Sequence, residues 1–194
     1  MTSDLTTEAR ILEVASRLFY ERGYHATTMR DLATGVGIKA ASFYNHFSSK
    51  QEILVRVCTD GTQAFYDGAI ACVEGLEDAR ERLRALIVWQ VSYDARNRYS
   101  ARVADAQLDA LNPQSRADVI EIRDAYDRLL SEVLVQGQAQ GHWRVDSLEI
   151  LRMGIVGMCT GIYVWYRESG PLTPEEIGEI YASLVLEGLV GSGA

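Results

Sequence analysis

The sequence predicts an all-α fold, in which short N-terminal helices are followed by a bundle of about six longer ones. Apolar residues recur with helical spacing in almost every segment, and no segment alternates with period two for long enough to form a sheet. Glycine or proline separates the segments. With 47% apolar residues in a chain of 194, there is enough apolar material for a substantial core.

The first predicted helix is amphipathic and ends at Gly23. A second, short helix starts at the capping box that Thr28 forms with Asp31, and it is interrupted by Gly35 and Gly37. The apolar residues of the first helix fall on one continuous face: Ile11, Val14, Ala15, Leu18 and Phe19.

A third short helix is expected at about 39–47, and a fourth begins where Ser49 and Glu52 form a second capping box. The segment 77–97 is apolar on almost every side, which is typical of a helix in the centre of a bundle. These elements suggest an N-terminal domain at 1–48 and a second domain at 49–194. The remaining predicted helices cover 100–111, 115–140, 147–168 and 174–190.

Charge is distributed unevenly along the chain. The formal net charge is −8, so the surface as a whole repels nucleic acids and anionic membranes. Residues 1–50 instead hold six basic and five acidic residues, among them both lysines of the chain, Lys39 and Lys50. Any contact with a polyanion therefore falls to the N-terminal part.

Three features bear on the location of the protein. Cys58, Cys72 and Cys159 are widely spaced and form no CxxC pair, which argues against disulfides and favours a reducing cytoplasm. The N-terminus lacks the basic start and apolar stretch of a secretory signal. The longest apolar run, 153–166, is shorter than the roughly 20 residues that span a bilayer, so we expect a buried helix and no membrane partner.

Catalytic and metal-binding motifs are absent from the sequence. His25, His46 and His142 form no pair at metal-ligand spacing on a helix. There is no nucleophile elbow, P-loop or dinucleotide-binding glycine motif. We therefore expect no enzyme activity, no metal and no cofactor.

The two short helices before and after the glycine turn at 35–37 have the helix-turn-helix arrangement, whose second helix enters the DNA major groove. On a helical wheel Phe43 and Phe47 point inward, whereas Ala41 and Asn45 lie on the opposite face. Asparagine can pair with an adenine edge, and alanine can contact a thymine methyl group. Taken singly, these residues could also be ordinary solvated positions.

The stretch FYERGYHATTMRDLATGVGIKAASFYNHFSSKQEIL closely resembles the N-terminal DNA-binding domain of TetR-type transcriptional regulators. The motifs that carry the resemblance are Gly23-Tyr24, Thr28, Gly37-Ile38 and Phe43-Tyr44-x-His46-Phe47-x-x-Lys50. His46 either contacts DNA or supports the recognition helix. The resemblance implies a DNA face formed by Thr28, Lys39, Ala41, Ser42, Tyr44, Asn45, His46 and Lys50.

Two residues depart from the family pattern. Lys39 stands where the family often has a serine or threonine as the cap of the recognition helix, and loss of that hydroxyl weakens the cap by about 1 kcal/mol. A lysine there adds a phosphate contact. Asn45 replaces a frequent histidine, so the operator sequence cannot be transferred from relatives.

The segment Trp165-Tyr166-Arg167-x-x-Gly170-Pro171-Leu172-Thr173 resembles the end of TetR-type repressors of steroid and lipid catabolism, some of which bind acyl-CoA thioesters. The resemblance implies an acyl-CoA or other lipid-derived effector and a homodimer formed through the last two helices. The residues expected at the dimer interface are Ile155, Ile162, Tyr181, Leu184, Val185 and Leu189.

Three glycines, Gly154, Gly157 and Gly161, lie along one predicted helix, where each costs about 1 kcal/mol relative to alanine. Either another helix approaches closely there, or the missing side chains leave room for a ligand, or the glycines are tolerated without a role.

An effector pocket requires an apolar cavity with a few polar groups. We expect Tyr93 and Arg96 to be its polar contacts, although Arg96 could instead form a surface ion pair. An aromatic stripe at helical spacing is also what a bundle core requires. The residues expected to bind the ligand are Trp89, Tyr93, Arg96, Tyr126, Cys159 and Tyr163.

Together these observations predict a cytoplasmic, ligand-responsive transcriptional regulator that binds an inverted-repeat operator in double-stranded DNA as a homodimer. The favoured reading is a repressor that a small apolar or acyl-type effector releases, and an activator is the alternative within the resemblance. The alternative from another class is a helical small-molecule-binding or protein-interaction module without specific DNA binding.

Overall fold

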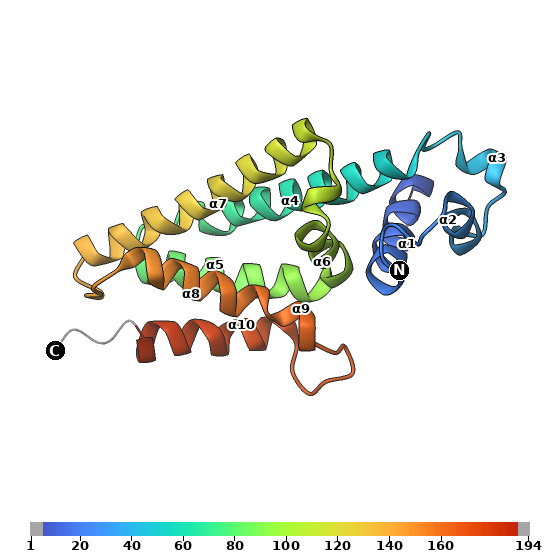
Figure 1. The fold of residues 1–194 in the computed structure, drawn as a ribbon. Helices are drawn as coiled ribbons and strands as arrows, with labels where there is room; N and C mark the ends of the chain where they lie inside the picture. The colour runs from blue at the N-terminus through green and yellow to red at the C-terminus, as the bar shows by residue number, and fades with distance from the viewer. Residues whose placement is uncertain (1–5, 190–194) are drawn as a thin grey trace. The chain divides into compact units, whose positions relative to one another are not determined.

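The computed structural model describes residues 6–189, which contain helices and no strand. The fold is therefore all-α, as the sequence predicts (Figure 1). Its elements in chain order are α1 Thr7–Arg22, α2 Met29–Val36, α3 Ala40–Phe43, α4 Lys50–Val73, α5 Ala79–Arg96, α6 Arg98–Ala106, η1 Leu108–Ala110, α7 Pro113–Ala139, α8 Leu148–Thr160, α9 Ile162–Trp165, α10 Pro174–Ser183 and the π-helical turn η2 Leu184–Leu189.

The chain forms two compact units, each with its own core. The N-terminal unit comprises the residues up to 62 together with 99–120, and the C-terminal unit comprises 63–98 and the residues from 121 onward. The first unit therefore extends beyond the boundary expected at residue 48. Part of α4, α6 and the start of α7 pack with α1 to α3, since Leu54, Val103 and Val119 are buried in the same cluster as Phe19 and Phe43.

Side chains cap the start of most helices. The hydroxyl of Thr28 accepts a hydrogen bond from the Asp31 N–H, and Thr173 forms the same capping box with Glu176. Asp78 caps α5 through the N–H groups of Arg80 and Glu81. In contrast, Lys39 at the start of α3 makes no side-chain cap hydrogen bond.

Helix α5 is central in the C-terminal unit, as its apolar sequence predicts. It packs against α8, α9 and α10, and the last of these lies along it in Figure 1. Gly178 permits this close approach, because a Cβ atom there would lie 2.8 Å from Val88 Cα. The core of the unit is built from α4, α5, α7, α8, α9 and α10 and includes Leu83, Leu86, Ile87, Leu130, Val133, Leu134, Ile155, Cys159 and Ile162.

Three predicted helices differ in the structure. The recognition segment is helical only at Ala40–Phe43, and residues 44–46 form a turn. The helix expected at 147–168 breaks at Gly161 into α8 and α9. The last helix changes to π-type hydrogen bonding after Ser183.

The apolar segment Leu148–Trp165 has a mean hydropathy of 1.3 and is long and apolar enough, by composition, to cross a membrane. In the structure it is interrupted at Gly161, and it buries Ile155, Cys159 and Ile162 in the core of the C-terminal unit. Its other side is exposed, since Met153 is 54% accessible. The expected buried helix is therefore correct for one face only.

Candidate DNA interface, core polar cluster and partner face

The helix-turn-helix is formed by α2 and α3. The turn depends on Gly37, whose φ of +79° is in the left-handed region that favours glycine. Its N–H closes α2 on the carbonyl oxygens of Ala33 and Thr34. Phe43 and Phe47 are 0% and 1% exposed, so the inward face of the recognition segment is the one the sequence predicts.

The opposite face of the recognition segment is open to solvent. Tyr44 is 54% exposed, and the backbone N–H groups of Asn45 and His46 bond to the carbonyl oxygens of Ser42 and Phe43 in a tight turn. His46 is half-buried, an exposure that fits both contact with DNA and support of the recognition segment. Five of the predicted DNA-binding residues are exposed here: Lys39, Ala41, Ser42, Tyr44 and Asn45.

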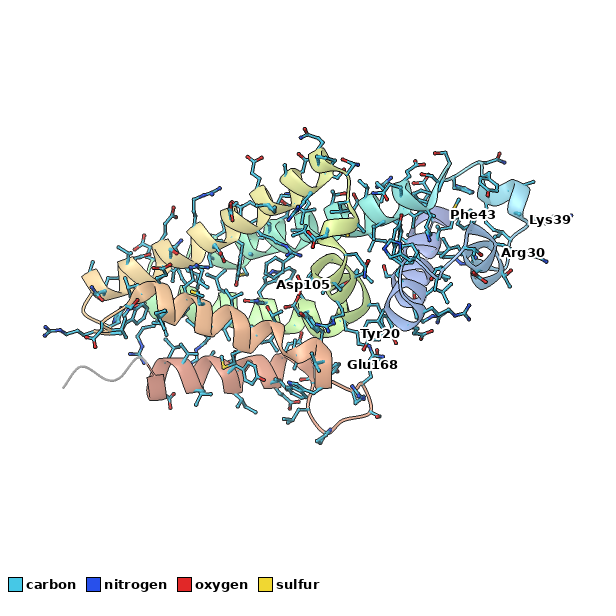
Figure 2. The ribbon with its side chains drawn as sticks, viewed as in Figure 1. Tyr20, Arg30, Lys39, Phe43, Asp105 and Glu168 are labelled. Atoms are coloured by element: carbon cyan, nitrogen blue, oxygen red, sulfur yellow. The ribbon has the colours of Figure 1, made fainter. Side chains whose placement is uncertain are left out.

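A further basic side chain belongs to this end of the N-terminal unit. Arg30, on the first turn of α2, is exposed and lies at the same end of the unit as Lys39 (Figure 2). Arg30 was not among the DNA-binding residues predicted from the sequence. The sequence feature that could have predicted it is its position two residues after the Thr28 cap. At that position the helix N-terminus and the arginine charge both favour contact with a phosphate.

Two of the side chains predicted to contact DNA form hydrogen bonds within the protein. The ammonium of Lys50 donates to the carbonyl oxygens of Tyr24 and Thr27, both at 2.7 Å, and of His25 at 3.2 Å. All three of its N–H donors are therefore used within the protein, and we propose that Lys50 positions this loop in place of the predicted phosphate contact. Thr28 is exposed, but its hydroxyl donates to Asp31 Oδ2 at 2.5 Å and serves the capping box.

A polar cluster lies in the core of the C-terminal unit. The hydroxyl of Tyr126 donates to Gln90 Oε1 at 2.8 Å, and Gln90 Nε2 donates to Thr160 Oγ1 at 3.2 Å. Tyr126 and Gln90 are 5% and 3% exposed. Burial raises the pKa of the Tyr126 hydroxyl and of the Cys159 thiol well above their ordinary values, so both groups stay protonated at neutral pH. Gln90 and Thr160 were missed by sequence reasoning.

Aromatic rings surround this polar cluster. Phe65 packs edge-on against Tyr126 and Tyr93, with ring centroids 4.7 and 5.4 Å away. Trp89 lies 5.4 Å from Tyr93 and donates its indole N–H to the Phe65 carbonyl oxygen at 3.0 Å. Burial raises the pKa of Tyr93 to about 12. The structure therefore brings Trp89, Tyr93 and Tyr126 together, and buries Cys159 and Tyr163 in the same unit.

Arg96 does not join this cluster. Its side chain is 58% exposed and forms an ion pair with Glu175. The prediction of a buried polar contact is corrected, because the guanidinium lies at the edge of the unit, where water and a carboxylate satisfy it. The surface ion pair that the sequence left open is the arrangement observed.

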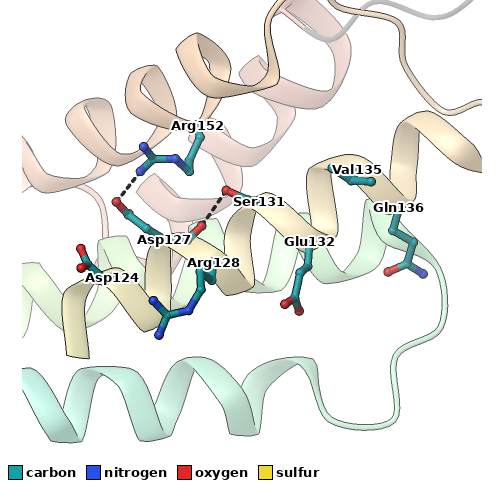
Figure 3. A pocket seen from close by; sticks show the side chains of 8 residues that line it. All are labelled: Asp124, Asp127, Arg128, Ser131, Glu132, Val135, Gln136 and Arg152. Carbon is teal, nitrogen blue, oxygen red and sulfur yellow. Dashed lines mark hydrogen bonds and ion pairs between the residues drawn. The ribbon is translucent and has the colours of Figure 1, made fainter. Parts of the chain in front are cut away.

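A hollow of about 680 Å³ runs along α7 and faces Arg152 of α8 (Figure 3). Arg152 reaches across to Asp127 at 2.5 Å, and only 19% of its side chain is exposed. Arg128 and Val135 also line the hollow. None of the predicted ligand residues lines it.

One face of the last helices is apolar and exposed. Of the predicted dimer residues, Leu184 belongs to it, with 51% exposure, and Tyr181 is half-buried. Ile155, Ile162 and Val185 are at most 2% exposed and pack inside their own core, so the assignment of these three to an interface is wrong. The side chain of Leu189 lies outside the described residues. The exposed set, which we call the partner face, is Ile150, Met153, Gly154, Gly157, Val164, Trp165, Ile180 and Leu184.

The glycines of α8 contribute to the partner face. A Cβ atom at Gly154 or Gly157 would meet no atom within 4 Å. Close approach of another helix, one of the explanations offered from the sequence, therefore does not account for these two glycines within the described part of the protomer. Gly161 is different, since a Cβ there would lie 3.3 Å from the Met158 carbonyl oxygen at the α8 break.

These features define a helix-turn-helix DNA-binding protein with a separate helical unit that carries a core polar cluster and an apolar partner face. Residues 11–57 match the family model of bacterial regulatory proteins of the tetR family, and residues 76–189 match the tetracyclin repressor-like C-terminal domain. The chain belongs to the TetR family of transcriptional regulators.

Similar proteins cover nearly the whole chain. The transcriptional repressor KstR2 of Mycobacterium tuberculosis is 35% identical over an alignment of 191 residues that covers 94% of this chain and 92% of that protein. The solved structure of that ketosteroid transcriptional regulator has a TM-score of 0.88 at 27% identity and covers 96% of both chains. The structure of AibR in complex with isovaleryl coenzyme A and operator DNA has a TM-score of 0.77 at 26% identity, covering 92% of this chain and 97% of that one.

Proposed function

We propose that this protein is a dimeric repressor that binds an inverted-repeat operator and is released by an acyl-CoA thioester. The observation that carries the proposal is the exposed recognition face beside two buried phenylalanines, in a chain that matches both TetR domain models. The M. tuberculosis relative is a repressor, which favours repression over activation.

Base recognition is assigned to Asn45, Ala41 and Ser42. The Asn45 amide pairs with an adenine edge, Ala41 contacts a thymine methyl group, and Ser42 donates or accepts one further hydrogen bond. Tyr44, Lys39 and Arg30 contact phosphate oxygens, which fix the position of the module without reading sequence. Thr28 and His46 support this surface.

Dimerisation is assigned to the partner face. A row of exposed apolar side chains beside two open glycines lets a second copy approach closely and removes this surface from water. Two recognition helices then read successive major grooves about 34–36 Å apart, which explains an inverted repeat.

The effector is assigned to the C-terminal unit. An acyl-CoA thioester has anionic phosphates and an apolar acyl group, and an AibR structure contains such a ligand. Arg152 and Arg128 are suited to phosphates. Arg152 and Cys159 share one face of α8, about 10 Å apart along the helix axis, so an acyl group can extend from the arginine toward Tyr126 and Cys159. There the thioester carbonyl accepts the hydrogen bond that the Tyr126 hydroxyl otherwise donates to Gln90 Oε1, among Tyr93, Trp89 and Tyr163.

Release from the operator is a population shift. The effector must bind one conformation of the dimer better than the other, and the free energy available for release equals that difference. Helices α4 and α7 both have residues in the two units. We assign the transmission of the shift to α4, because it follows the recognition segment directly in the chain. We also propose that the protein acts in the cytoplasm and that this regulatory role involves no catalysis.

The test is a selection from random duplex DNA with the purified full-length chain at low salt. Enrichment of an inverted repeat, with affinity that falls steeply as salt rises, supports the proposal. A panel of CoA thioesters is then added to the selected duplex, and release is expected for at least one of them, with free CoA as the control. Failure to enrich any sequence, after removal of copurified effector, would favour a binding module without specific DNA recognition.

A further inference from the structure

A second hollow in the C-terminal unit lies along α5, between Cys72 of α4 and the first turns of α10. It is open to solvent and has a volume of about 450 Å³. Its floor is apolar, because Ala85, Val88 and Trp89 face it from successive turns of α5. A volume of this size is sufficient for a small organic ligand. The hollow, which we call the α5 groove, contains neither Tyr126 nor Gln90, so it is separate from the core polar cluster.

The floor of the α5 groove is rigid. The Trp89 indole is fixed by its hydrogen bond to Phe65 and by Gly68 beneath the ring, where a Cβ atom would lie 2.0 Å from the indole. Gly178 holds α10 against Val88. A preformed aromatic platform of this kind can bind an apolar group with little loss of side-chain entropy.

Two ion pairs span the rim of the groove. Arg84 of α5 bonds to Glu179 of α10 at 2.5 Å, and Arg96 bonds to Glu175. All four side chains are between 41% and 58% exposed. Both guanidinium groups are therefore beside the apolar floor, and both of their carboxylate partners can turn into water.

We propose that the α5 groove binds an amphipathic carboxylate, whose apolar body lies on Val88 and Trp89. The ligand carboxylate accepts hydrogen bonds from Arg84 or Arg96 in place of Glu179 or Glu175. This site contains none of the predicted DNA-binding residues, and it shares only Trp89 with the proposed acyl-CoA site.

An anion can bind here although glutamates line the groove, because the ligand carboxylate replaces the carboxylate of Glu175 or Glu179 on its arginine. The guanidinium keeps its hydrogen bonds throughout, and the displaced glutamate is hydrated at once because it is half exposed. Burial of the apolar body then supplies the net driving force. Glu81 also lines the groove, and because its side chain is exposed it can turn into water as Glu175 and Glu179 do.

Binding in the α5 groove has a consequence for α10. The two ion pairs tie α10 to α5, and α10 carries Ile180 of the partner face, which continues into Leu184. A ligand that takes over one arginine removes one of these ties. Carboxylate binding and self-association are therefore expected to be thermodynamically linked.

Isothermal titration of the full-length chain with octanoate tests the site, with octyltrimethylammonium and 1-octanol as charge controls. The double variant Arg84→Gln/Arg96→Gln is expected to weaken octanoate binding about tenfold or more, because it removes both charge-assisted contacts. The double variant Glu175→Gln/Glu179→Gln is expected to tighten it by about threefold, because the competing carboxylates are gone. Arg80→Gln, on the same helix but outside the groove, is the matched control.

Three outcomes would overturn the proposal: no octanoate binding, equal affinity in both double variants, or tighter binding of the cation that weakens when the glutamates are removed. Tyr126→Phe separates the sites, because octanoate affinity is expected to be unchanged in this variant and would fall if the ligand entered the core cluster. If the arginine double variant does not fold, Ala85→Phe fills the groove and is expected to weaken octanoate binding to a similar extent.

Discussion

The ammonium of Lys50 bonds to the carbonyl oxygen of Tyr24 at 2.7 Å and also lies 4.5 Å from the centre of the Tyr24 ring. The first residue of α4 thereby holds the loop that leads into α2, through both its backbone and an aromatic face. The Tyr24 hydroxyl returns to α4 by donating to Gln51 Oε1 at 2.9 Å, and Gln51 Nε2 donates to the Ala110 carbonyl oxygen at 3.0 Å. The recognition module is therefore fixed by α4 from within the N-terminal unit.

Lys50→Met is expected to lower the free energy of unfolding by roughly 1–3 kcal/mol, because three carbonyl groups lose a charged donor. Urea denaturation measures this change. The dependence of operator affinity on salt is expected to keep its slope, because the three N–H donors of the Lys50 ammonium are used by carbonyl oxygens of the protein.

Lys39→Met is the matched control for Lys50. Its exposed ammonium is assigned to phosphate, so the variant is expected to reduce the salt slope by about one per protomer while leaving stability nearly unchanged. The opposite result, in which Lys50→Met reduces the salt slope and leaves stability unchanged, would show that Lys50 contacts DNA.

Asn45→Ala is expected to weaken binding to the selected operator by about 1–3 kcal/mol and to relax the preference at one base pair. Tyr44→Phe is expected to weaken binding to all duplexes equally, because it removes a phosphate contact. Fluorescence anisotropy on single-base operator variants measures both effects. Tyr20→Phe, at an exposed tyrosine of α1, is the control. An unchanged base preference in Asn45→Ala would show that another residue reads the base.

Tyr126→Phe is expected to destabilise the protein by about 1–3 kcal/mol, because the buried Gln90 carbonyl oxygen loses its donor. The double variant with Gln90→Met is expected to cost less than the sum of the two single changes, since it removes both partners. Additive losses in urea denaturation would mean that the hydrogen bond contributes no coupling.

Met153→Glu, in the centre of the partner face, is expected to convert the dimer to a monomer in sedimentation equilibrium, because two buried carboxylates would face each other across the two-fold axis. Val135→Glu makes the same change at an equally exposed site of α7 and is expected to leave the dimer intact. A dimer that survives Met153→Glu would place the interface elsewhere.

Stability is expected to fall in acid because capping carboxylates have lowered pKa values. The Thr28 hydroxyl and backbone N–H lower the pKa of Asp31, and the backbone N–H and hydroxyl of Thr173 lower that of Glu176. A carboxyl whose pKa is lower in the folded state stabilises the fold above its unfolded pKa, and this contribution is lost as the pH falls through the folded pKa. Melting temperatures should therefore drop below about pH 4. Asp31→Asn/Glu176→Gln should lower the melting temperature at pH 7 and flatten this dependence, and an unchanged profile would contradict the assignment.

Local sequence signals predicted the N-terminal unit well. The Thr28 box, the glycine turn and the inward pair Phe43 and Phe47 each depend on residues close in sequence, so spacing alone was sufficient. The role of Lys50 could not be predicted, because its partners lie 23 to 26 residues away along the chain. A lysine beside a DNA-binding motif suggests phosphate, and only the tertiary structure shows that its donors are used.

The C-terminal helices show a different limit. Both faces of 148–165 are apolar, so periodicity could not distinguish the face that packs in the protomer from the face that is exposed. Ile155 and Ile162 were predicted at the interface, whereas Met153 and the open Gly157 lie on the exposed face. The prediction of Arg96 as a pocket residue was wrong for a related reason, since its partner Glu175 follows 79 residues later in the chain.

Operator spacing tests whether one dimer reads two half-sites. Affinity is measured by anisotropy on the selected inverted repeat and on versions with about 5 or about 10 base pairs inserted at its centre, which correspond to half a turn and a full turn. Insertion of half a turn is predicted to reduce affinity to that of a single half-site, because it moves one major groove to the opposite side of the duplex. Equal affinity for all three duplexes, at one chain per duplex, would contradict the account.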